Sequence, residues 1–232
     1  MAHQIPNRLR PSSRNRADDR QNTLGQILEA AGHVFAEKGF DRATGREICE
    51  KAGVNTAAIN YYFGGVEGLY AAVLEEANNR LFTLEMVSAA VAGKPDAKSK
   101  LEALLSLVIG RLAGPVSSSW VLRVVGREIA APSPMFKALR EREFLLKLKI
   151  LKSIVGDLMG LPVEHPAVAR GCVSIMGPCI MLAIADRNLL KRAFPKLGLG
   201  PADASMLAKH MVQYAIAGLG VIASEERRNP SI

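Results

Sequence analysis

Cysteine and histidine are the residue types in this chain whose side chains could hold a metal ion or act as nucleophile and base. The chain has three cysteines and four histidines, at Cys49, Cys172, Cys179, His3, His33, His165 and His210. Zinc ligands usually come in pairs about two to five residues apart, and no two of these residues have that spacing. On a helix, Cys172 and Cys179 would share a face but lie too far apart along it to form a disulfide. We therefore expect no metal, no cofactor and a reducing compartment.

No other set of residues in the sequence has the layout of a catalytic site. Covalent catalysis needs a nucleophile with a base within reach, and phosphate-handling enzymes use a glycine-rich loop that cradles the anion. The sequence contains neither pattern. We therefore expect a binding protein and not an enzyme.

The composition favours a globular, helical protein. Hydrophobic residues make up 49% of the 232 residues and charged residues 22%, as in chains that bury a core. Aromatic residues make up only 5%, which suits helices better than sheets. No run approaches the ~18 uninterrupted apolar residues of a membrane span, and no apolar signal core follows the N-terminus. These features predict a cytoplasmic protein without a membrane partner.

The formal net charge of +8 is compatible with a nucleic-acid partner but does not demonstrate one. Residues 1–80 hold ten Lys and Arg against ten Asp and Glu, whereas residues 81–232 hold the remaining 20 against 12. The concentrated basic run near the N-terminus is Arg8, Arg10, Arg14, Arg16 and Arg20. We interpret residues 1–20 as a flexible basic arm that either follows DNA or stays solvated.

Beyond this arm, apolar residues recur at helical spacing, and glycine and proline separate the segments. The pattern predicts an all-α fold of about nine helices. The expected segments are residues 23–38, 44–52, 56–63, 66–92, 96–113, 116–130, 134–160, 165–187 and 202–226.

The second and third segments have the pattern of a helix-turn-helix. That motif needs apolar residues where the helices clasp, a small residue where they cross, and glycine where the turn requires positive φ. Cys49 takes the small position and Gly53 the turn, and Thr44 with Glu47 forms the sequence of a capping box. The clasping positions are Ile48, Ala52, Val54, Ile59 and Tyr62.

The residues around this motif resemble the DNA-binding domain of the TetR family. The run Thr44-Gly-Arg-Glu-Ile-Cys-Glu-Lys-Ala-Gly-Val-Asn-Thr-Ala-Ala-Ile-Asn-Tyr-Tyr-Phe-Gly-Gly-Val-Glu-Gly-Leu-Tyr70 carries the resemblance, with Phe35-Ala-Glu-Lys-Gly39-Phe40 before it. Ala57-Ala-Ile-Asn-Tyr-Tyr-Phe-Gly and Gly126-Arg-Glu-Ile-Ala-Ala-Pro-Ser-Pro are similar to the CecR-like branch. The resemblance implies a helix-turn-helix domain over residues 21–80 and a ligand-binding, dimerising domain over residues 81–232.

The resemblance also implies roles in DNA binding. Thr44 and Arg46 at the start of the second helix, and Tyr61 in the third, would contact phosphates. Base edges would be read from the third helix by Asn55, Thr56, Ala57 and Asn60, since Asn can bridge adenine and a methyl group can pack on thymine.

One residue departs from the family pattern. TetR-type chains usually carry Lys just before the Glu-x-Leu of the fourth helix, near a phosphate, whereas this chain has Val66. One phosphate contact is therefore missing. With the neutral segment 1–80, this leaves open the alternative of a helical ligand-binding or scaffold protein with weakened DNA binding.

In the TetR family the last two helices of each subunit form a four-helix dimer interface. We therefore expect a homodimer joined through residues 165–187 and 202–226. Small and apolar residues on these segments are the interface candidates: Gly171, Ser174, Met211, Tyr214 and Gly218.

A small-molecule effector, of unknown identity, is the remaining implied partner. We expect an apolar or amphipathic molecule between residues 100 and 185, with Trp120, Arg123 and Arg127 as candidate contacts. The fourth helix, expected over residues 66–92 as one rod of about 40 Å, would transmit its binding to the DNA-reading helix. The full hypothesis is a ligand-controlled regulator, by family default a repressor, of a palindromic DNA operator.

Overall fold

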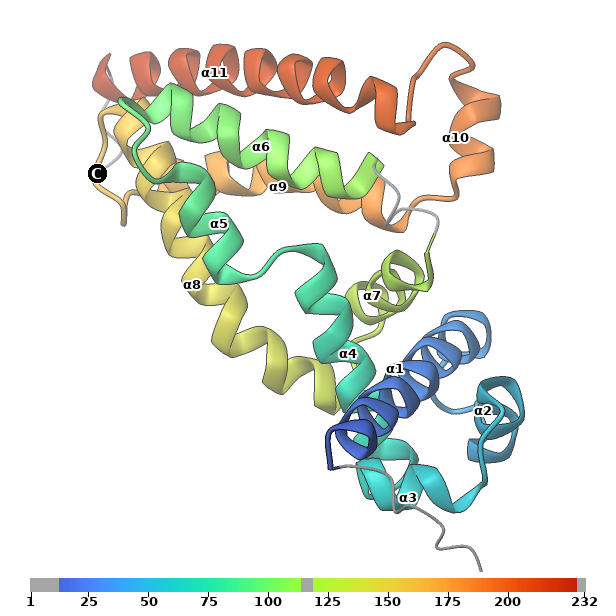
Figure 1. The fold of residues 1–232 in the computed structure, drawn as a ribbon. Coiled ribbons are helices and arrows are strands. Elements are labelled where there is room, and N and C mark those ends of the chain that lie inside the picture. Colours follow the sequence, from blue (N-terminus) through green and yellow to red (C-terminus); the bar gives the residue numbers. More distant parts are fainter. Residues whose placement is uncertain (1–12, 114–118, 229–232) are drawn as a thin grey trace, which may run out of the picture. The chain divides into compact units, whose positions relative to one another are not determined.

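The computed structural model describes residues 13–113 and 119–228, and all regular elements in these ranges are helical (Figure 1). The predicted all-α fold is confirmed, with eleven α-helices and one short 3₁₀ segment where about nine helices were expected. The chain divides into two compact units, and the division falls between Val73 and Leu74.

The first unit contains α1 (Ser13–Lys38), α2 (Gly45–Ala52), α3 (Ala57–Phe63) and the beginning of α4 (Val66–Leu81). Its core is made by apolar residues at helical spacing on α1 together with residues of the next three helices. The fully buried members include Ile27, Ala31, Val34, Phe35, Ile48, Cys49, Leu69 and Val73. Phe35 packs edge-on against Tyr70, with 4.7 Å between ring centroids. This core holds α2 and α3 in fixed positions on α1.

Helix α1 begins at Ser13, earlier than the predicted start at Thr23. Residues 13–20 were assigned to the flexible arm, and the structure places them in the helix; residues 1–12 lie outside the described part of the chain. Alanine and arginine favour helices, and no proline follows Pro11 before the helix ends. The helix ends at Gly39, which has φ of 77° and donates its N–H to the Phe35 carbonyl at 2.8 Å.

The second unit packs α5 (Leu84–Val91), α6 (Ala97–Ala113), α8 (Pro134–Met159), α9 (Pro166–Ile184) and α11 (Ala204–Arg228) around one core. Figure 1 shows α11 running along α6, with α9 beside them. Leu101, Val155, Met159 and Val168 are fully buried in this core. Helix α7 (Trp120–Ala130) packs against α9. Its predicted start at residue 116 lies outside the described residues.

The fourth predicted helix is wrong in its length. Helix α4 ends at Leu81, and α5 starts at Leu84, so residues 66–92 do not form a single rod. Thr83 causes the break, because its side chain accepts from the Met86 N–H at 3.2 Å and so caps a new helix.

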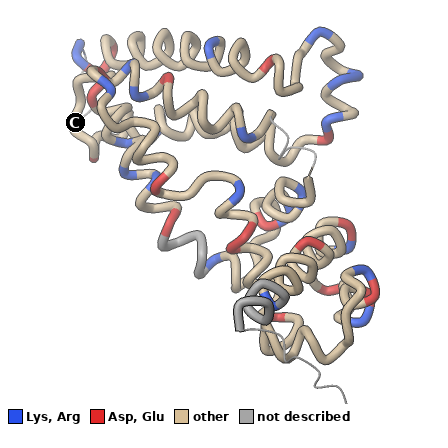
Figure 2. The backbone as a smooth tube through the Cα atoms, in the orientation of Figure 1, with Lys and Arg blue, Asp and Glu red and all other residues tan. Residues whose placement is uncertain are grey.

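A further helix, α10 (Arg187–Ala193), was not predicted. It begins because the Asp186 carboxylate accepts from the Asn188 N–H at 2.7 Å and from the Leu189 N–H at 3.2 Å. Its last turn carries Lys191 and Arg192, and Figure 2 shows the repeated basic positions along it.

Candidate nucleic-acid interface

The N-terminus of α2 is fixed by Thr44. Its hydroxyl oxygen accepts from the Glu47 N–H at 3.3 Å, as the capping sequence predicts. The Glu47 carboxylate forms an ion pair with Lys38 at 2.7 Å, which ties α2 to the end of α1. Thr44 is exposed, and a hydroxyl that accepts one hydrogen bond can still donate its proton. The cap therefore leaves a donor for a phosphate at this helix start.

The turn between α2 and α3 depends on Gly53. This residue has φ of 69° and ψ of 29°, in the left-handed region, where a side chain is strained. The Val54 N–H donates to the Cys49 carbonyl at 3.0 Å and the Gly53 N–H to the Glu50 carbonyl at 3.3 Å. These two bonds form a Schellman motif, which ends α2 and reverses the chain toward α3.

Asn55 is the residue that starts α3. Its side-chain oxygen accepts from the Ala57 N–H at 2.8 Å, and its carbonyl accepts from the Ala58 N–H at 2.9 Å. A bidentate contact to adenine needs both the oxygen and the nitrogen of an Asn amide. One lone pair of the Asn55 oxygen is used to start α3, while the second lone pair and the amide nitrogen remain available for the base contact, which stays a prediction.

The other predicted base-reading residues share the outer face of α3. Thr56, Ala57 and Asn60 are exposed, whereas Ile59 is 3% exposed and anchors the opposite face in the core. Tyr61, the predicted phosphate contact, is 73% exposed. The structure thus brings these residues together on one short, rigid helix with its polar side outward.

Arg46, the second predicted phosphate contact, already has a charged partner. Its guanidinium donates to the Glu50 carboxylate at 2.8 Å across one turn of α2. The hydrogen bond and charge of Glu50 raise the pKa of Arg46 above its usual value. Arg46 remains fully charged and exposed, so a phosphate would compete with Glu50 for it.

Arg20 is a basic residue whose place the sequence did not reveal. It lies on α1, and its guanidinium carbon is 5.8 Å from the centre of the Tyr62 ring. Tyr62 packs edge-on against Tyr61 at 4.8 Å between centroids. This stacking holds one cation of the predicted arm beside the exposed end of α3. The signal for it was the continuous helical sequence from Ser13 onward.

Val66 occupies the family's lysine position, and its side chain is used for packing. A Cβ placed on Gly45 would lie 3.2 Å from the Val66 Cγ2 atom. Val66 therefore packs closely on the start of α2 and is half-buried. Helices α2 and α4 therefore meet through this apolar contact, and the position carries no positive charge.

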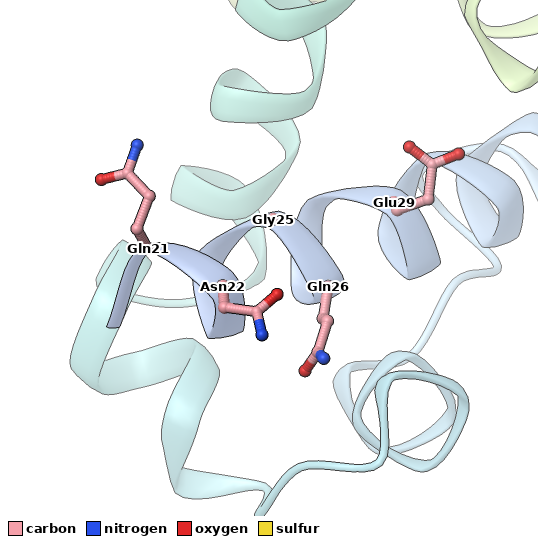
Figure 3. Close-up of a pocket in the computed structure, with 5 residues that line it drawn as sticks. All are labelled: Gln21, Asn22, Gly25, Gln26 and Glu29. Atoms are coloured by element: carbon pink, nitrogen blue, oxygen red, sulfur yellow. The ribbon is translucent and has the colours of Figure 1, made fainter. Parts of the chain in front are cut away.

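A shallow hollow is lined by Gln21, Asn22, Gly25, Gln26 and Glu29. Figure 3 shows that all five belong to one helix, α1, and that the side chains of Gln21, Asn22, Gln26 and Glu29 point in different directions. A Cβ added to Gly25 would meet nothing within 4 Å. No second element of the described chain lines the hollow, so it lacks the walls of a ligand site.

Comparison with known families decides the identity of the chain. Residues 97–222, more than half of it, match the model of the C-terminal domain of the HTH-type transcriptional dual regulator CecR. Residues 27–73 match the model of the bacterial regulatory proteins of the tetR family. The chain belongs to the TetR family. Within that family it falls in the CecR-like branch, and it is a helix-turn-helix transcriptional regulator.

Individual relatives of this TetR-family regulator agree. It is 30% identical to the probable HTH-type transcriptional regulator YttP of Bacillus subtilis over 152 residues. This alignment covers 62% of this chain and 71% of YttP. The chain is 53% identical over 47 residues to CecR of Shigella flexneri, covering 20% and 21% of the two chains. The fold resembles FadR of Bacillus halodurans, with a TM-score of 0.63 and 20% identity over 85% of this chain and 96% of the other. The fold also resembles FadR of Bacillus subtilis, solved with stearoyl-CoA. The TM-score is 0.62 and the sequence identity 21%, over 84% of this chain and 98% of the other.

The three predicted effector contacts of this TetR-family regulator do not share one environment in the structure. Trp120 is completely buried, whereas Arg123 and Arg127 are exposed on α7. Arg123 and Arg127 therefore face away from the interior that holds Trp120. The sequence could not make this distinction because α7 has apolar residues on more than one side.

The predicted interface residues also differ in their exposure to solvent. Gly171 is buried, and a Cβ on it would lie 2.7 Å from the Leu219 side chain of α11. Gly171 therefore packs inside the subunit, and not on the exposed surface where a dimer contact was expected. Met211 is half-buried against the same core. Ser174, Tyr214 and Gly218 are exposed.

The exposed faces of α9 and α11 are strongly apolar. On α9, Val173, Gly177, Ile180 and Ile184 repeat at helical spacing on the side away from the core. Val173 is 70% exposed and, on α11, Tyr214 is 74% exposed. By length and composition alone α9 and the stretch Pro201–Arg228 could each cross a membrane, with 33% and 22% of their apolar windows buried. In a TetR-family regulator, one packed face and one apolar exposed face are typical of a subunit contact.

A small interior cavity lies beside Arg187. Its volume is about 10 Å³, and residues of α6, α9 and α11 complete its lining. The Arg187 guanidinium donates to the carbonyls of Leu112 and Leu199, and burial lowers the pKa of Arg187. A space of this size holds one water at most, so Arg187 here fastens the end of α6 to the loop before α11.

Proposed function

We propose that this TetR-family regulator binds a palindromic DNA operator as a cytoplasmic homodimer, and that a small-molecule effector bound in its second unit weakens that binding. Repression of transcription is the sign that this arrangement supports best. The observation that carries the proposal is the outward polar face of α3, formed by Thr56, Ala57, Asn60 and Tyr61 on a helix anchored by Ile59. A helix presented in this way fits the major groove.

The direct test is a footprint of the purified protein on the DNA upstream of its own gene, repeated at several salt concentrations. We expect two protected half-sites about one helical turn of DNA, ~34–36 Å, apart or at a multiple of that spacing. Protection should weaken as salt is raised, since phosphate contacts release counterions. No salt-sensitive protection on any genomic fragment would contradict the proposal and favour a ligand-binding protein without DNA recognition.

Asn60→Ala should relax sequence discrimination. Asn60 is exposed on α3 one turn after the helix start, where it can bond to a base edge. We expect a loss of about 1–3 kcal/mol on the preferred operator and a smaller loss on operators changed at one base pair. Competition binding against single-base variants measures both.

The matched variant is Tyr61→Phe, which removes only a hydroxyl from the neighbouring exposed residue. It should weaken all sequences alike, because a phosphate contact carries no sequence information. If Asn60→Ala also weakened all sequences equally, Asn60 would not contact a base.

Dimerisation is supported by the apolar stripes on α9 and α11. The exposed residues Val173, Ile180 and Ile184 on α9, with Tyr214 and Val221 on α11, leave large side chains in water in the isolated subunit. Burying them against a second copy would remove this exposure. The Arg170–Glu226 ion pair of 2.8 Å keeps the two helices together beside the stripe.

Tyr214→Glu should dissociate this dimer. The substitution places a carboxylate on the apolar stripe, where burial without a partner is costly. We expect the dimer dissociation constant to rise at least tenfold, about 1.4 kcal/mol, which light scattering over a concentration series will show. Gln213→Glu adds the same charge at the adjacent exposed position, off the stripe, and should leave the mass unchanged. A monomeric unsubstituted protein at micromolar concentration would refute the interface.

Control by a ligand is supported by the size of the second unit and by the FadR structure solved with stearoyl-CoA, which has the same fold. An effector that releases DNA must itself bind less tightly to the DNA-bound protein, because linkage is reciprocal. Calorimetry with and without saturating operator tests this. An affinity that operator does not change would exclude the effector as a regulator.

A further inference from the structure

Trp120, at the start of α7, has a buried donor for which the described residues offer no acceptor. The side chain is completely buried, and its indole N–H has no hydrogen-bond partner within the described chain. A buried polar group left unsatisfied costs free energy comparable to a lost hydrogen bond. This N–H therefore marks a place where an acceptor would be stabilised.

One arginine lies over this indole, and a second arginine is bonded to the backbone of the first. The guanidinium carbon of Arg80, at the end of α4, is 5.2 Å from the centre of the Trp120 ring. Arg111, on α6, donates to the Arg80 carbonyl at 3.0 Å and contacts the Met86 sulfur of α5 at 3.6 Å. The end of α4 and helices α5, α6 and α7, all in the second unit, thus contribute to this group of contacts.

The charges around this cluster leave a positive excess. Arg80 is paired with Glu76 at 2.7 Å. In contrast, both groups that Arg111 contacts, a carbonyl and a thioether, are neutral. On the α8 side, Lys147 pairs with Glu143 at 3.0 Å, and Asn78 bridges the two. Of the three cations, only Arg111 is without a carboxylate among the described residues.

We propose that Trp120, Arg80 and Arg111 bind the carboxylate head of a small amphipathic anion, the effector class of this regulator. A carboxylate only accepts hydrogen bonds, and this cluster offers only donors. It would satisfy the indole N–H and balance the charge of Arg111. The inference rests on the proposed ligand control and names the ligand class for it.

The surroundings select an apolar tail behind the head. The Met86 thioether and the indole ring offer no further polar partner. The ring of Phe82 lies nearby, with its centre 5.7 Å from the Lys147 ammonium nitrogen. Arg80 has a side chain 38% exposed, so a charged head can approach it from solvent and then meet the buried N–H. Highly hydrated inorganic anions would gain nothing from the apolar part of the site.

The chain carries its own probe, because Trp120 is its single tryptophan. Fluorescence excited in the indole band therefore reports this site alone. The test titrates the full-length protein with octanoate, octanol and octylamine, which share a tail and differ in the head group. We expect a saturable change with octanoate, at least tenfold weaker binding of octanol and no saturable change with octylamine.

Variants locate the binding. Arg111→Met should weaken octanoate at least tenfold, while Arg111→Lys, which keeps the charge, should restore part of the affinity. Trp120→Phe removes the N–H and the probe, so calorimetry is used, again with a loss of about tenfold expected. Arg123→Gln, an exposed cation on the same helix, is the matched control and should bind as the unsubstituted protein does. Circular dichroism confirms that each variant is folded.

Equal binding of octanol and octanoate, no response to octanoate, or octanoate binding that survives Arg111→Met would overturn the proposal. An ordered water on the indole would give no saturable response and so falls under the second outcome. Failure here is distinguishable from failure of the regulator itself: a protein that footprints its operator but ignores octanoate loses only this inference. A protein that binds octanoate through Arg111 but protects no DNA loses only the proposed function.

Discussion

A Gly68→Ala variant is expected to lose operator binding and to unfold at a markedly lower temperature than the unsubstituted protein. A Cβ on Gly68 would lie 1.9 Å from the Phe63 carbonyl oxygen. That oxygen belongs to the backbone at the end of α3, so no side-chain rotation relieves the clash. Either α4 moves away from α3 or the end of α3 unwinds. The cost should reach about 3 kcal/mol, the upper end for overpacking.

Thermal unfolding followed by circular dichroism measures the stability, and operator affinity is measured at a temperature where both proteins are folded. Gly25→Ala is the control, because Gly25 lies within α1 with nothing within 4 Å of an added Cβ. That change should stabilise by up to about 1 kcal/mol, the helix propensity difference. Equal unfolding temperatures for Gly68→Ala and the unsubstituted protein would show that the α3–α4 junction is not tight.

Gly171→Leu should have the largest effect in the second unit, and it should act within one subunit. A Cβ on Gly171 would lie 2.7 Å from a Leu219 methyl group and 3.1 Å from one of Val155. A leucine adds three more carbons, so α9 must separate from α8 and α11. We expect destabilisation of about 3 kcal/mol.

Denaturant unfolding at several protein concentrations separates this effect from lost dimerisation. If Gly171 lies inside the subunit, the destabilisation persists at high protein concentration. Gly110→Leu, on the open side of α6, is the matched control and should change stability little. A stably folded monomer produced by Gly171→Leu would return this glycine to the dimer surface.

The helix-turn-helix could be predicted from sequence because its residues are dictated locally. The turn needs positive φ, which Gly53 supplies at 69°, and the start of α2 needs a cap, which Thr44 supplies. The role of Asn55 could not be predicted, because capping and base reading use the same side chain. The 2.8 Å bond from the Ala57 N–H shows the capping contact, and the base contact stays a prediction.

The second unit was predicted less well because one of its long helices, α9, lacks a polar face. Helix α9 is apolar nearly all round, so periodicity does not tell which side is buried. Gly171, which the sequence suggested for the dimer surface, is buried, and Val173, which it did not single out, is exposed. The helix boundaries at Thr83 and Asp186 could have been predicted, since Thr and Asp are good helix caps. The apolar residues on both sides of Thr83 made the boundary at Thr83 look like the interior of one helix.

The ion pairs of the DNA-binding unit affect the thermodynamics of its interface. Arg46 is neutralised by Glu50 and Lys38 by Glu47 before any DNA arrives. When a phosphate displaces Glu50, the DNA releases a condensed cation, but the freed carboxylate attracts one back from solution. The dependence of affinity on salt therefore counts only those cations that come to the duplex unpaired. If the α3 side chains discriminate operators as proposed, this discrimination should depend little on the salt concentration.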